Sequence, residues 1–210
     1  PRLFEGHKGA VLCIKLERSV TTTQAPHMAT GSEDATVRIW NVQSAECLQV
    51  LKDKRQGQLP SPVMAVDLSP ATDRVVSGTR HGVFFLWTMS TGEMLQHYTP
   101  HQGMTINVLQ LDGDIVMSAS NDRSVRILDV ANNRFRLYQG HESLVNCAVR
   151  VDARPGRGGG ASGEPSLPET IVSGSNIGEI FTFTVDRHPS NDAIDRRGYF
   201  SGGKQKGLAF

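Results

Sequence analysis

The chain has 210 residues, enough for one ordinary domain with a hydrophobic core. Its 22 basic and 21 acidic residues leave a formal net charge of +1, which argues against a strongly basic surface for nucleic acid or membranes. Its longest apolar runs have the length of strands, well short of the ~20 residues of a membrane-spanning helix.

The first predicted elements form one unit of four short strands. The Gly6–His7 pair leads into an apolar strand over residues 11–14. The segment T-G-S-E-D-A-T-V-R-I-W over residues 30–40 predicts a β-hairpin, because a small polar turn is followed by alternating apolar residues. A further strand over residues 46–50 follows a turn that contains Ser44.

The same order of elements returns three times along the chain. The hairpins start at Thr30, Ser77, Ser118 and Ser173, so successive copies are between 41 and 55 residues apart. Internal repeats of this length are typical of solenoids and propellers, and four short antiparallel strands form one propeller blade.

The repeated pattern resembles the WD-repeat family. A Gly-His pair, a Thr-Gly-Ser-x-Asp turn and a Val-Arg-Ile-Trp-Asn run follow one another in the first unit, and the resemblance covers roughly residues 3–184. It implies an all-β, WD40-type β-propeller with four blades of four antiparallel strands, part of a larger, typically seven-bladed ring. The expected blades span residues 7–51, 60–98, 101–138 and 141–184. A flexible insertion is expected over 152–168 and a tail or partial strand over 185–210.

The resemblance also implies a hydrogen-bonded group of His, Ser or Thr, Asp and Trp that holds each blade together. The first unit contains all four as His7, Thr30, Asp34 and Trp40. The other units keep parts of the group: Ser77 and Trp87 in the second, His101, Ser118 and Asp122 in the third, and His141 and Ser173 in the fourth. We expect these three blades to depend more on apolar packing.

A catalytic interpretation of the same residues is disfavoured. A threonine, a histidine and an aspartate could form a nucleophile and its base, but their spacing recurs while the polar members are lost from unit to unit. The sequence contains no phosphate-binding loop, zinc-protease motif or dinucleotide-binding motif, and its three cysteines lack metal-ligand spacing. We therefore expect no enzyme activity, no cofactor and no metal.

The cysteines indicate a reducing compartment. Cys13 and Cys147 occupy equivalent positions in different units, too far apart for a disulfide whose Cα separation must be below ~7 Å. We expect buried free thiols and a cytoplasmic or nuclear protein.

An arc of four blades would leave two sheet faces open to water, which soluble monomers avoid. Further blades of a longer parent chain are one solution, favoured because the sequence opens at Pro1 without a methionine. A partner chain could complete the ring instead. In the third solution the four blades close alone, with residues 2–4 as the last strand of the fourth blade.

The expected function is that of a non-catalytic scaffold or adaptor that binds proteins or peptides on the propeller rims, because loops on a rigid β-frame carry specificity. No small-molecule substrate and no membrane partner are expected. The alternative is a nucleic-acid-associated module of an RNA–protein or chromatin complex, which the near-zero charge disfavours. The resemblance places the candidate partner-binding residues on one rim, as Lys8, Ala10, Glu33, Arg80, Asn121, Glu142 and Asn176.

Overall fold

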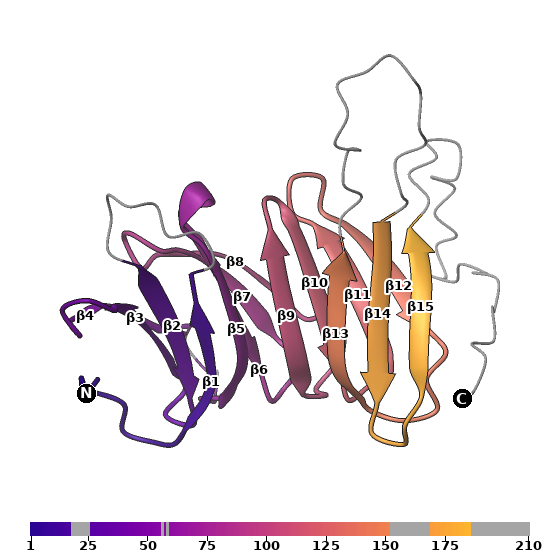
Figure 1. Ribbon diagram of the computed structural model, residues 1–210, viewed down its shortest axis with the longest axis horizontal. Helices are drawn as coiled ribbons and strands as arrows, with labels where there is room; N and C mark the ends of the chain where they lie inside the picture. The colour runs from indigo at the N-terminus through magenta and orange to yellow at the C-terminus, as the bar shows by residue number, and fades with distance from the viewer. Residues whose placement is uncertain (18–25, 56, 58, 152–168, 186–210) are drawn as a thin grey trace, which may run out of the picture.

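The computed structural model describes residues 1–17, 26–55, 57, 59–151 and 169–185. Within these ranges the chain forms four antiparallel sheets, as predicted, and one short 3₁₀ helix. The sheets stand side by side in an arc, with the N-terminus beside the first sheet (Figure 1). No helix in the described ranges is long and apolar enough to cross a membrane.

Each sheet is one blade, numbered here in chain order. Blade 1 contains β1 (Val11–Leu16), β2 (His27–Ser32), β3 (Thr36–Asn41) and β4 (Cys47–Lys52). Blade 2 contains β5 (Val63–Ser69), the 3₁₀ helix (Pro70–Thr72), β6 (Arg74–Thr79), β7 (Phe84–Thr88) and β8 (Met94–Tyr98). Blade 3 contains β9 (Ile106–Asp112), β10 (Ile115–Ser120), β11 (Ser124–Asp129) and β12 (Arg134–Gln139). Blade 4 contains β13 (Val145–Val151), β14 (Glu169–Ser175) and β15 (Ile180–Val185).

Strands pair in chain order within every blade. Blades 1 to 3 have four strands each, whereas blade 4 has three in the described part of the chain. The strand or tail expected over residues 185–210 lies outside the described residues from 186 onward, as does the insertion expected over 152–168.

Neighbouring blades are joined by apolar clusters, because both faces of an inner blade point toward another sheet. Ala29, Ile39 and Leu51 of blade 1 pack with Val66 and Trp87 of blade 2. Equivalent clusters join blade 2 to blade 3 and blade 3 to blade 4. Burying such side chains contributes roughly 1.5–3 kcal/mol each, so these interfaces are a large part of the stabilisation of the arc.

The outer faces of the two end blades are open. Val11 and Ile14 of β1 are equivalent to Val63 and Val66 of β5, because each pairs with the corresponding residue of the second strand in its blade. Yet Val11 and Ile14 are 54% and 63% exposed, whereas Val63 and Val66 are 4% and 6% exposed. These residues are all aliphatic, so the difference in exposure arises because blade 2 has a preceding blade to cover β5 and blade 1 has none to cover β1.

Cys147 corrects one expectation from the sequence. Cys13 and Cys147 take equivalent positions opposite Gly31 and Gly174. Cys13 is half-buried with its Sγ 3.7 Å from the carbonyl of Val63 in the next blade, but Cys147 is exposed, because no blade covers β13 on that side. Both thiols are free, as expected, but only Cys13 is shielded.

The N-terminal residues lie against blade 1 and not against blade 4. The ring of Phe4 packs edge-on against Trp40 with 5.6 Å between centroids, and the guanidinium of Arg2 donates to the carbonyl of Val42. Residues 1–6 form no strand. The structure therefore does not support closure of the four blades through residues 2–4.

Candidate functional site

Blade 1 brings the four residues of the predicted group together. Nε2 of His7 lies 2.8 Å from Oγ1 of Thr30, and Nδ1 lies 3.0 Å from Oδ2 of Asp34. The indole N–H of Trp40 donates to the same threonine oxygen at 2.8 Å. A carboxylate only accepts, so Nδ1 of a neutral His7 carries the proton, and Nε2 accepts the hydroxyl proton of Thr30. The chain of bonds runs from the indole to the carboxylate with every member paired.

The carboxylate of Asp34 is the centre of this network. Besides His7, it accepts the backbone N–H of Lys8 at 2.8 Å, the backbone N–H of Thr36 at 2.9 Å and the Thr36 hydroxyl at 2.6 Å. Burial opposes ionisation of Asp34, but these hydrogen bonds outweigh it and hold its pKa well below the usual range. Asp34 is therefore charged at neutral pH and organises the turn between β2 and β3.

Blade 3 repeats the arrangement without the tryptophan. Nδ1 of His101 lies 2.8 Å from Oδ2 of Asp122, and Nε2 lies 2.8 Å from Oγ of Ser118. Burial opposes ionisation of Asp122, but hydrogen bonds from His101 and Ser124 lower its pKa. Leu128 stands where tryptophan stands in blade 1, and it is fully buried in the cluster that joins blades 2 and 3.

In blade 4 the acid comes from a residue that the sequence comparison missed. Nε2 of His141 lies 2.8 Å from Oγ of Ser173, as in the other blades. Oε2 of Glu179 lies 3.4 Å from Nδ1 of His141 and accepts the hydroxyl of Ser175 and the backbone N–H of Glu142. Glu179 comes two residues after Ile177, the position aligned with Asp34, and its longer side chain reaches back. The sequence signal that could have identified Glu179 is the presence of an acidic residue within the same hairpin turn.

Blade 2 keeps one bond of the group. The indole N–H of Trp87 donates to Oγ of Ser77 at 2.9 Å. Leu59 stands four residues before β5, where His7 stands before β1, and it is 85% exposed. His81 takes the position of Asp34.

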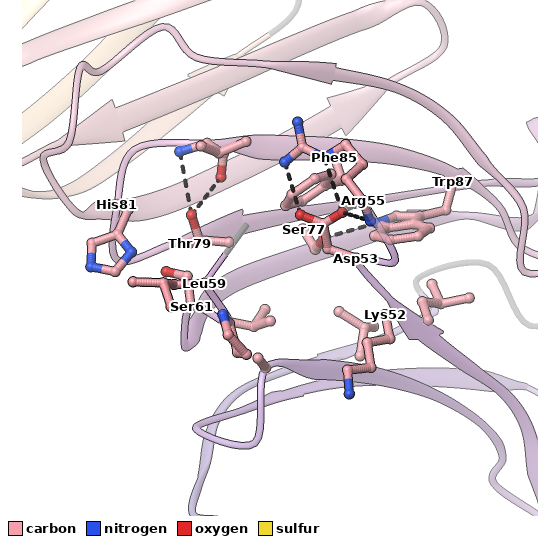
Figure 2. Close-up of a pocket in the computed structure, with 16 residues that line it drawn as sticks. Lys52, Asp53, Arg55, Leu59, Ser61, Ser77, Thr79, His81, Phe85 and Trp87 are labelled. Atoms are coloured by element: carbon pink, nitrogen blue, oxygen red, sulfur yellow. Dashed lines mark hydrogen bonds and ion pairs between the residues drawn. The ribbon is translucent and has the colours of Figure 1, made fainter. Parts of the chain in front are cut away.

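A pocket of about 90 Å³ opens beside this bond, between blades 1 and 2. Figure 2 shows Ser77, Phe85 and Trp87 on one side of it and Lys52 across from them, with Leu59 and Ser61 close to Thr79. Asp53 and Arg55 form an ion pair at 2.8 Å on its wall, and the Arg55 guanidinium lies over the Phe85 ring. No group of three or more potential metal ligands occurs in the parts of the chain that the structure covers.

The candidate binding residues of the hairpin turns occupy one repeated backbone position. The N–H of each donates to the carbonyl of the residue directly before the first strand of its own blade, at 2.9–3.1 Å, in the pairs Glu33–Ala10, Arg80–Pro62, Asn121–Thr105 and Asn176–Leu144. These turns lie along the lower rim in Figure 1. The repeated bond therefore places four side chains at matching points of four rigid sheets.

These residues differ in how free their side chains are. Glu33, Arg80 and Asn176 are exposed. Asn121 is half-buried, and its Oδ1 accepts from Nδ2 of Asn107 at 2.7 Å, so this side chain is engaged within blade 3. The side chains of Lys8, Ala10 and Glu142 are also exposed on this rim.

The first repeat of the chain matches a known protein family. The family described as "WD domain, G-beta repeat" matches residues 1–41, the part of the chain that contains the complete group of blade 1. The matched segment is one WD repeat. An uncharacterized WD repeat-containing protein of Schizosaccharomyces pombe is 26% identical over 156 residues, which are 70% of this chain and 41% of that protein.

Other relatives match shorter stretches. The small ribosomal subunit protein RACK1y of Oryza sativa is 31% identical over 60% of this chain and 35% of its own length. Subunit I of eukaryotic translation initiation factor 3 from Aspergillus oryzae is 31% identical over 41% of this chain and 23% of its own length. The chain thus spans less than half the length of these relatives.

Solved structures agree on the propeller fold. Saccharomyces cerevisiae Sqt1 superimposes with a TM-score of 0.71 at 13% identity, over 86% of this chain and 48% of that chain. The computationally designed Ika4 protein superimposes with a TM-score of 0.65 at 23% identity, over 88% of this chain and 96% of that chain. The chain therefore has the β-propeller architecture that its sequence predicts.

Proposed function

We propose that this WD-repeat chain is a non-catalytic scaffold that binds protein partners on the rim carrying Glu33, Arg80 and Asn176. The observation that carries the proposal is the repeated backbone bond that fixes these exposed turns on rigid sheets. Rigid presentation reduces the conformational entropy that binding costs, so such a rim suits the recognition of protein surfaces.

The polar groups that could suggest catalysis are used within the blades. The hydroxyls that contact His7, His101 and His141 belong to Thr30, Ser118 and Ser173, which are only 5%, 1% and 1% exposed, so a substrate has little access to them as nucleophiles. Relatives named as a ribosomal subunit protein and as a subunit of an initiation factor belong to multi-protein assemblies, which supports a role in binding proteins. The three free cysteines support a reducing compartment, cytoplasmic or nuclear.

The proposal includes a completed ring. The open faces of blades 1 and 4 expose apolar residues at positions that are buried between neighbouring blades. Further blades, from the same parent chain or from a partner chain, would cover them.

The test compares two charge-neutral double variants in affinity purification followed by quantitative mass spectrometry. Glu33→Lys with Arg80→Glu alters the proposed rim, and Gln43→Lys with Ala131→Glu alters exposed turns on the opposite rim. The proposal expects that the first pair loses co-purified proteins at least fivefold and that the second retains them. Loss with the second pair alone, or with neither, would overturn it.

A further inference from the structure

A second pocket, of about 240 Å³, opens between blades 2 and 3. It is lined by Tyr98, Thr99 and Pro100 at the end of blade 2 and by Arg126 and Phe135 of blade 3. The first strands of neighbouring blades contact one another, so the last strands, β8 and β12, place this pocket on the outer side of the arc. All of its lining residues belong to the described part of the chain. An engineered cavity of roughly 150 Å³ binds benzene, so the pocket has room for one aromatic ring.

The aromatic walls of this pocket are held in place by their neighbours. The Tyr98 ring packs against Phe84 with 5.0 Å between centroids and meets the Phe135 ring edge-on at 5.9 Å. The Tyr98 hydroxyl donates to Oε1 of Gln96. Phe135 is nevertheless 43% exposed. Rigid aromatic side chains that remain accessible suit protein recognition, because they lose little conformational entropy when a partner binds.

Arg126 lacks the aromatic neighbour that the equivalent arginine of blade 1 has. Arg126 takes the place in β11 that Arg38 takes in β3, and Leu128 stands where Trp40 stands. The guanidinium of Arg38 lies over the Trp40 ring, 5.8 Å from its centroid. No ring lies over Arg126 among the residues that the structure describes. A guanidinium is attracted to an aromatic face within about 6 Å, so Arg126 can accept a ring from outside the chain.

The charge around Arg126 favours a neutral ring over an anion. Nη2 of Arg126 lies 3.7 Å from Oδ2 of Asp122, which offsets part of the positive charge. Nε of Arg126 is buried and is therefore out of reach of a ligand in the pocket. The side chain is still 26% exposed, so the accessible part of Arg126 is the planar group itself.

We propose that this pocket binds an aromatic side chain, phenylalanine or tyrosine, of a partner protein. The ring stacks on the guanidinium of Arg126 and packs against the rings of Tyr98 and Phe135, with Pro100 as a further apolar contact. That the ring comes from a protein rests on the proposed scaffold function. That the pocket accepts a ring rests on its own lining residues.

Nuclear magnetic resonance of the ¹⁵N-labelled chain tests the pocket without a partner protein. The probes are N-acetyl-phenylalanine amide and its aliphatic counterpart N-acetyl-leucine amide, both at millimolar concentration. A ring stacked on a guanidinium shifts the arginine Nε–H resonance by its ring current, and Arg126→Lys assigns that resonance. We expect a saturable shift of Arg126 with the phenylalanine probe and no shift of Arg38, which already lies over Trp40.

Two alanine variants on β8 and β12 make the test specific. Phe135 is 43% exposed, so Phe135→Ala should fold normally and weaken binding of the phenylalanine probe roughly fivefold or more. Leu95→Ala, at a 48% exposed residue of β8 that does not line the pocket, should leave binding unchanged. Equal binding of the leucine probe, equal shifts of the two arginines, undiminished binding by Phe135→Ala, or no shift at all would overturn the proposal.

The same two variants test the source of the ring in the affinity purification described for the rim. Phe135→Ala should lose at least one co-purified protein that Leu95→Ala retains, and retention of every protein would overturn the assignment to a partner protein. Binding of the phenylalanine probe together with an unaltered set of partners for the rim variants would refute the scaffold rim and leave the pocket standing. Loss of partners with the rim variants but no binding of the probe would refute the pocket alone.

Discussion

Replacing Asp34 with alanine removes the acceptor on which four donors of blade 1 converge. The exposed N–H of Lys8 regains water, and the Thr36 hydroxyl can rotate. Nδ1 of His7 has less access to water, because its side chain is 7% exposed. A buried donor that loses its acceptor costs roughly 1–3 kcal/mol, and loss of the half-buried Thr36 N–H bond adds about 1 kcal/mol. We expect the free energy of unfolding to fall by about 3 kcal/mol.

The assay is urea unfolding at pH 7, followed by tryptophan fluorescence and by far-UV circular dichroism. A fall in the midpoint with an unchanged m-value identifies a loss of stability and not a change in the unfolding reaction. Asp34→Asn retains one acceptor oxygen and the shape of the side chain, so it should cost less than Asp34→Ala.

Glu179→Ala provides the matched comparison in blade 4. Glu179 also faces a histidine, but at 3.4 Å and with a side chain that is 23% exposed. Its removal should therefore cost clearly less than removal of Asp34. Equal losses for the two alanine variants, or a loss below about 1 kcal/mol for Asp34→Ala, would refute the view that the complete network stabilises blade 1.

Three further predictions concern pH, packing and thiol reactivity. The folded-state pKa of Asp34 lies below its unfolded value of about 3.9, so its stabilisation is present above pH ~4 and is lost as pH falls toward the folded pKa; urea midpoints at pH 3 and pH 7 should differ less in Asp34→Asn. Gly31→Ala would place a methyl group 2.5 Å from a valine of β5 and should cost about 1–3 kcal/mol in urea unfolding, more than Gly174→Ala on the open face of blade 4. Burial raises the pKa of Cys13 to about 12, so the exposed Cys147 should react first with a disulfide reagent followed by absorbance and peptide mapping, and faster modification of Cys13 would contradict the packing of blades 1 and 2.

The strands, the hairpins and the hydrogen-bonded group of blade 1 can be predicted from the sequence, because each repeat is defined by residues that are close together in the chain. Alternating apolar residues and small polar turns predict every hairpin, and the spacing of His7, Thr30, Asp34 and Trp40 indicates which side chains meet in blade 1. Such signals depend on strand periodicity and turn preference within a few dozen residues, so they survive without knowledge of the neighbouring blades.

Only the tertiary structure shows which side chains are long enough to contact a partner and which residues are covered by a neighbouring blade. Glu179 replaces the missing aspartate because its longer side chain spans a gap in space that an alignment by position does not show. Cys13 and Cys147 have the same place in their hairpins, yet only Cys13 is covered, since burial is set by the next sheet and not by the residue. Blade 2 has Leu59 where the first blade has His7, and a pocket lined by residues of blades 1 and 2, which no single repeat of the sequence shows, lies beside Ser77.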